Sequence, residues 1–354
     1  MRPALKPGLL PVWRDRDTLQ IGIDPRRAVA LTGMAGAAWV ISLLDGSRDR
    51  AQVIAAAGDR GMPAQLADRV LTLLAAGGAL DDFPAGTYRV LPRQLRARLA
   101  PELAAASLAT GYCDGGARAL ARRRAAHVRI LGGGRLGPGI ACILATSGVG
   151  QVDSAEAAAQ GPAAQGPAGT PSGRAQGPAG TPSARAQAPA GTPSGSARSR
   201  ARAAQAQLPD LAVLVGITDP ELAARLMHER IPHLSASASE AIGIVGPLVV
   251  PGQSACLRCL DLLRTDRDPA WPLILAQLAG RQPDPLACDA PLAASVAAQC
   301  AAQALAFIDR PAGAGAVLNG TLELVLPAWQ WRRRTWQQHP DCGCGSDRLR
   351  TTGS

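Results

Sequence analysis

The stretch VRILGGGRLGPGIACILATSGVG, residues 128–150, places a short apolar strand, a glycine-rich turn and an Ala-rich helix in direct succession. Within the turn, Gly132, Gly134 and Gly137 are spaced as G-x-G-x-x-G. Glycines at this spacing allow a tight turn and let the backbone N–H groups of the helix N-terminus approach a phosphate closely. The motif therefore predicts a nucleotide-binding loop. The alternative is a turn of the same shape that binds nothing and keeps its glycines only for packing.

The chain beyond this unit continues to alternate strands and helices. Residues 211–217, LAVLVGI, form a continuous apolar run, as in strands buried on both faces of a parallel sheet. A helical pattern at 219–229, strands in IPHLSAS and IGIVGPLVV, and a terminal hairpin in TLELVLP and WQWRRRTW follow. This succession predicts an α/β domain over residues 128–345, with a Rossmann-like, mostly parallel sheet flanked by helices.

The residues before it indicate a separate small domain. Between residues 1 and 85, short strands at TLQIGI and RAVALTG precede three apolar-periodic helices, which is typical of a winged-helix-like module. Small folds of this kind bind DNA, or bind peptides along an exposed strand. The helix AQLADRVLTLL carries no basic stripe, which argues against DNA binding. Residues 86–127 are expected to form a helical connector.

Residues 157–207 differ abruptly in composition from their surroundings. Units of the form AQGPAGTPSGR start at Ala164, Ala175 and Ala186. They contain prolines and glycines and no large apolar side chain, so their burial would not offset the chain entropy lost on ordering. We expect a disordered insertion in the α/β domain, and a disordered tail at 346–354.

Two pairs of cysteines have the spacing of metal ligands. Cys256 and Cys259 form a C-x-x-C pair, and Cys342 and Cys344 form a C-x-C pair near the end of the chain. Four thiolates satisfy a tetrahedral zinc ion and leave no open coordination position, so the predicted site is a structural zinc clip. A redox-active pair, or His339 in place of one cysteine, are the alternatives.

The composition restricts the compartment and the partners. The N-terminus has no signal-peptide pattern and no uninterrupted apolar run has the length of a membrane span, so we expect a cytoplasmic protein that does not enter a membrane. The net charge of +10 comes almost entirely from arginine. WQWRRRTW at 329–336 would allow stacking on nucleic acid, but an exposed hairpin is the simpler interpretation.

The order of glycine loop, apolar strand, GPLVVPGQSACLRCL and late cysteine pair resembles the ThiF/MoeB family of ubiquitin-activating-type adenylyltransferases. HPDCGC and the N-terminal module are similar to the ThiF-like, leader-peptide-binding partner proteins of azole-forming peptide cyclodehydratases. The resemblance implies that Gly132, Gly134 and Gly137 bind phosphate. It also implies that Glu156 binds ribose and that Asp219 binds magnesium and ATP. A homodimer is implied as well.

The sequence departs from the family in the residues that would contact phosphate. Lys6 is the only lysine and Asn319 the only asparagine, so the family's lysine and its Asn-x-x-Arg pair have no counterpart near the glycine loop. If active, the protein would adenylate a carboxylate of a peptide or small carrier protein with ATP. The alternative is a catalytically degenerate, leader-peptide-binding scaffold for a separate cyclodehydratase.

Deletion of residues 158–206 tests the expected insertion. A segment that buries no apolar surface contributes little to stability, so the melting temperature measured by differential scanning calorimetry should stay nearly unchanged. A large drop would mean that the segment is folded and that the predicted domain boundaries are wrong.

Overall fold

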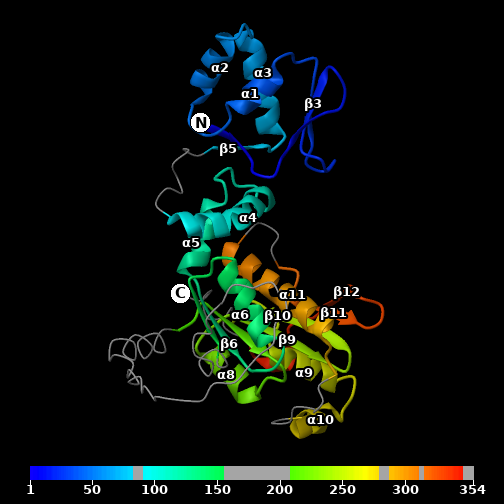
Figure 1. Ribbon diagram of the computed structural model, residues 1–354. Coiled ribbons are helices and arrows are strands. Elements are labelled where there is room, and N and C mark those ends of the chain that lie inside the picture. The colour runs from blue at the N-terminus through cyan, green and yellow to red at the C-terminus, as the bar shows by residue number, and fades with distance from the viewer. Residues whose placement is uncertain (83–90, 155–207, 279–286, 311–314, 346–354) are drawn as a thin grey trace, which may run out of the picture.

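The computed structural model describes residues 1–82, 91–154, 208–278, 287–310 and 315–345 (Figure 1). The predicted insertion at 157–207, the predicted tail at 346–354 and Glu156 all lie outside the described residues. The described elements form three groups along the chain: a small N-terminal group, two connecting helices, and a large sheet covered by helices.

The N-terminal group has two small sheets and its own hydrophobic core. Three strands form an antiparallel sheet in the order β2-β3-β4, and β1 pairs with β5. Helix α2 begins with a capping box, in which Asp49 and Gln52 exchange hydrogen bonds. The bounds are β1 Pro3–Leu5, β2 Pro11–Trp13, β3 Thr18–Ile21, β4 Val29–Thr32, α1 Ala37–Ser42, α2 Arg50–Gly58, α3 Ala64–Ala76 and β5 Leu80–Asp82.

The helices α4 (Arg93–Ala109) and α5 (Ala117–Ala125) lie between this group and the large sheet (Figure 1). Lys6, which directly follows β1, joins the N-terminal group to α4: its Nζ lies 2.6 Å from Oδ1 of Asp81 and 2.8 Å from the carbonyl oxygen of Ser107. On the other side, the Arg123 guanidinium on α5 pairs with Asp309 at 2.6 Å. Both ion pairs are buried. The hydrogen bond from Lys6 to Ser107 therefore connects the N-terminal group to α4, and the Arg123–Asp309 ion pair connects α5 to α11.

The large sheet has seven strands in the order β12-β11-β10-β9-β8-β6-β7. Strands β7, β6, β8 and β9 run parallel, and β10, β11 and β12 are added antiparallel. The predicted α/β class is confirmed, and the sheet is mixed because the last three strands form a meander. The bounds are β6 His127–Leu131, β7 Gln151–Ser154, β8 Leu211–Val215, β9 His233–Ser239, β10 Ile242–Val249, β11 Gly320–Val325 and β12 Gln330–Thr335.

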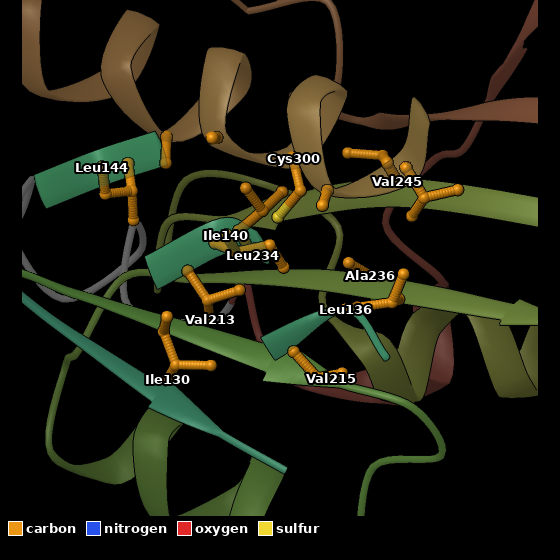
Figure 2. Packing of buried hydrophobic residues seen from close by; sticks show 14 of the residues in the cluster. Ile130, Leu136, Ile140, Leu144, Val213, Val215, Leu234, Ala236, Val245 and Cys300 are labelled. Atoms are coloured by element: carbon orange, nitrogen blue, oxygen red, sulfur yellow. The ribbon is translucent and has the colours of Figure 1, made fainter. Parts of the chain in front are cut away.

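Helices cover both faces of the parallel strands. On β8, Val213 belongs to the core that includes α6 (Gly137–Thr146) and α11 (Ala290–Asp309), and Leu214 belongs to a second cluster with α8 (Pro220–His228). Figure 2 shows the first of these cores, in which side chains from α6, including Ile140, meet those of the strands. The continuous apolar run in the sequence is thus explained by burial on both faces.

Two more helices follow β10, namely α9 (Leu257–Thr265) and α10 (Trp271–Leu278). Of the helices in the described residues, α11 alone is long and apolar enough to cross a membrane, with a mean hydropathy of 1.5. It instead packs against α6, β9 and β10, which accounts for its apolar composition.

Replacing Lys6 with methionine tests the buried ion pair. The Asp81 carboxylate, which has 0% exposure, would lose its cation and stay buried. Removal of one partner from a buried pair typically costs about 3–5 kcal/mol, so urea denaturation should show a loss of that size. Arg26→Ala, in an exposed pair, is the control and should leave the free energy of unfolding nearly unchanged. A Lys6→Met protein as stable as the wild type would contradict the account.

Candidate functional site

The glycine loop connects the end of β6 to the start of α6, where the sequence places it. Gly132 and Gly134 have φ angles of 104° and 84°, which residues with a side chain rarely adopt. A Cβ at Gly132 would overlap the carbonyl oxygen of Val215 at the end of β8. At Gly134 no atom lies within 4 Å of such a Cβ. The first glycine therefore serves packing, and the second serves the turn and leaves open space.

The N-terminus of α6 is free of a capping side chain. Leu136 occupies the N-cap position without a side-chain hydrogen bond, and no acidic residue lies in the first turn. Gly137 is the first residue of the helix. Gly139, rather than Gly137, lets α6 pack closely on α11, because a Cβ at Gly139 would lie 3.1 Å from the Cβ of Ala297. Apart from Pro138, which has no N–H, a helix start of this kind offers backbone N–H groups and a positive dipole end to an anion.

Asp219 lies at the same edge of the sheet as the glycine loop. It directly precedes α8, and β8 and β6 are parallel neighbours, so their carboxyl ends meet at one edge. Its Oδ1 accepts a hydrogen bond from the backbone N–H of Glu221 at 2.9 Å, which makes Asp219 the N-cap of α8. The side chain is exposed, and the second carboxylate oxygen is available to a cation.

The single lysine and the single asparagine are engaged elsewhere. Lys6 is buried among β1, β5 and α4. The Asn319 side chain accepts a hydrogen bond from the backbone N–H of Ala255 at 2.7 Å, beside the cysteine cluster. Neither replaces the phosphate-binding residues that the family resemblance implies. Arg135 is the cation within the loop, and its Nη1 donates to the carbonyl oxygen of Cys288 at 3.2 Å.

The four predicted zinc ligands come together. All four sulfurs lie within 4.8 Å of one another. Cys256 is 3.4 Å from Cys342, and Cys259 is 3.3 Å from Cys344, distances too long for disulfides. Cys256 caps α9, and Cys342 ends the short 3₁₀ helix Pro340–Cys342, so the cluster joins the start of α9 to the end of the chain.

The donor set fits a structural zinc ion. Four thiolates complete a tetrahedral shell, and no open position is left for a substrate. His339 does not join the cluster: its Nε2 lies 3.0 Å from Oδ2 of Asp266. The hydrogen bond with Cys256 lowers the pKa of Cys259 to about 4, and burial raises the pKa of Cys344 to about 12. Without metal the cluster therefore holds protons that zinc would displace.

A cavity of about 840 Å³ lies beside the cluster. It is lined by residues of α8, β9, β10, α9, α10 and β11, and Cys256, Cys342 and Cys344 form part of its wall. No motif predicts this cavity. The sequence reflects it only in the alternation of β9, HLSASAS. His233, Ser235 and Ser237 line the cavity, and Leu234, Ala236 and Ala238 belong to the core that includes α11.

Comparison with known proteins finds no matching family model and no matching curated protein. Solved structures do match. E. coli MccB with AMPCPP and MccA superposes with a TM-score of 0.61 at 14% identity, over 98% of this chain and 99% of that one. E. coli MccB with ATP superposes with a TM-score of 0.59 at 14% identity, over 97% of this chain and 99% of that one.

The chain has the fold of MccB. The resemblance to ThiF-type proteins is thereby confirmed for the fold. A heterocyclase in complex with substrate and cofactor matches with a TM-score of 0.62 at 16% identity, over 99% of this chain. This chain spans 40% of that heterocyclase, whereas it spans nearly all of MccB.

Zinc analysis tests the cluster. Freshly reduced protein should contain about one zinc ion per chain by inductively coupled plasma mass spectrometry. Cys259→Ser should lower that content sharply, whereas Cys142→Ser, which changes an exposed cysteine outside the cluster, should not.

Zinc affinity should also fall as the pH is lowered, because protons compete for Cys256 and Cys344, whose pKa values are raised. A competition titration with a chromophoric chelator measures this dependence. Zinc-free wild type, or zinc content unchanged in Cys259→Ser, would contradict the assignment.

Proposed function

We propose that the protein binds ATP at the loop from Gly132 to Gly137 and adenylates a carboxylate of a peptide or small carrier protein. The supporting observation is the open start of α6 beside Asp219, in a fold that matches E. coli MccB over nearly its full length. MccB was solved with ATP, and with AMPCPP and MccA. That likeness supports a peptide-modifying role, and both the role and the substrate of this chain are part of the proposal.

In this proposal each residue of the site has a separate role. Backbone N–H groups of the glycine loop and the start of α6 hold the phosphates. Asp219 holds magnesium, and Glu156 contacts the ribose. A carboxylate oxygen of the substrate attacks the α-phosphorus, the bond to the β-phosphate oxygen breaks, and pyrophosphate leaves. Arg135 supplies positive charge within the loop, in place of the absent lysine.

A non-catalytic scaffold is the second candidate. The observation that favours it is the burial of Lys6, which leaves the glycine loop without any lysine. In this case the winged-helix-like N-terminal domain would bind a leader peptide and deliver it to a cyclodehydratase. The edge strand β2 offers unpaired backbone, and exposed Trp13 and Leu10 lie on or beside it. A homodimer and a cytoplasmic location belong to both proposals.

Calorimetry with ATP and magnesium separates the two candidates. The adenylyltransferase predicts micromolar binding that is weakened at least about tenfold in Asp219→Asn, since asparagine keeps the helix cap and loses the charge. Asp49→Asn, at the N-cap of α2, is the matched control and should bind ATP like the wild type. Absence of heat at millimolar ATP, from folded and zinc-loaded protein, would rule out the first candidate and leave the scaffold.

A further inference from the structure

The cavity beside the cysteine cluster is separate from the glycine loop. None of residues 132–137 lines it, and Asp219 does not, although its neighbours Thr218 and Pro220 do. Its volume of about 840 Å³ falls within the range of roughly 300–1,000 Å³ usual for ligand sites. The cavity therefore adjoins the carboxyl end of β8 and has room for a ligand of its own.

The walls of the cavity are largely apolar and partly uncovered. Leu275 and Leu278 reach it from α10, Met227 reaches it from α8, and Ile217 precedes α8. Ile217 is 47% exposed and Leu278 is 37% exposed. Helix α10 has no buried residue, although five of its eight residues are Leu, Ile or Trp. Apolar side chains that gather around a cavity and remain in contact with water favour a partner that covers them.

A few polar groups are placed among these walls. The hydroxyls of Ser235 and Ser237 on β9 line the cavity and have no hydrogen-bond partner within the described parts of the chain. Such sparse polar groups in an apolar wall are typical of ligand sites, where they fix the orientation of the ligand. They fit the backbone N–H and C=O groups of an extended peptide.

The charged residues that line the cavity are Glu221, Arg258, Asp261 and Arg264, and of these Arg258 could pair with an acidic group on the ligand. Asp261 is already engaged, since it accepts from Nε1 of Trp271 at 3.2 Å and pairs with Arg264. Arg258 lines the cavity, is exposed, and forms no ion pair with any described residue. The overall charge of +10 acts in the same direction, because it attracts anionic partners.

We propose that this cavity binds an extended apolar segment of the peptide substrate, with an acidic residue of that segment on Arg258. The inference rests on the proposed peptide-handling function and specifies which peptides are accepted. Apolar side chains would lie against Leu275, Leu278 and Met227. The peptide backbone would bond to Ser235 and Ser237.

Fluorescence anisotropy with fluorescein-labelled hexapeptides tests the proposal on the full, zinc-loaded chain. A peptide rich in Leu and Phe with one Glu should bind at least about tenfold more tightly than a peptide of equal charge rich in Ser and Asn. Ala224→Trp, which fills the cavity from α8, should weaken binding of the apolar peptide at least about tenfold. Ala276→Trp, on an exposed part of α10 outside the cavity, is the matched control and should change it less than about twofold.

Two further variants and a calorimetric measurement complete the test. Ile217→Asp places a charge in the apolar wall and should weaken binding even if Ala224→Trp fails to fold. Arg258→Gln should abolish the preference for the Glu peptide over its Gln counterpart. Equal affinity for the apolar and polar peptides, or unchanged binding in Ala224→Trp and Ile217→Asp, would overturn the proposal. ATP calorimetry on the same preparations shows separately whether the proposed nucleotide site fails.

Discussion

The close approach of Gly132 to the end of β8 is the constraint on which the rest of the site depends. Any side chain at this position would overlap the Val215 carbonyl oxygen, so only glycine lets the turn after β6 lie directly on β8. That contact sets where α6 begins. It also brings the start of α6 to the sheet edge from which β8 leads into Asp219. The phosphate-binding and metal-binding parts of the proposed site therefore share one edge.

The position of α6 also determines how the helices pack in the core. Gly139 lets α6 approach α11, and α11 in turn packs on β9 and β10, so the antiparallel half of the sheet is held against the parallel half (Figure 2). At the far end, the cysteine cluster joins the start of α9 to the end of the chain. The cavity lies between these two fixed regions, and both contribute to its walls.

Local rules were sufficient to predict the parts of the chain whose determinants are close in sequence. The strand, turn and helix around Gly132 were predicted from glycine spacing, and β8 from its continuous apolar run. The cysteine cluster was predicted although its pairs are far apart, because each C-x-x-C or C-x-C pair already limits the geometry of two ligands. The roles of Asp219 and Glu156 came from family resemblance, and Glu156 lies outside the described residues.

Features that depend on distant contacts were not predictable. The pairing of β1 with β5 and the Lys6–Asp81 ion pair join residues about 75 positions apart, and no local pattern specifies such a partner. The cavity is formed by residues from α8, α9, α10, β9, β10 and β11 and from the end of the chain, and no one of these segments specifies it alone. Helix α10 has an apolar sequence but no buried residue, and its composition alone does not reveal that exposure.

A crystal structure of the zinc-loaded protein with AMPCPP and magnesium would test the central claim most directly. We predict that the phosphates lie on the backbone N–H groups between Gly132 and Gly139, with the metal ion on Asp219. A nucleotide bound elsewhere in the chain, or a loop at the start of α6 that stays empty at saturating AMPCPP, would contradict it.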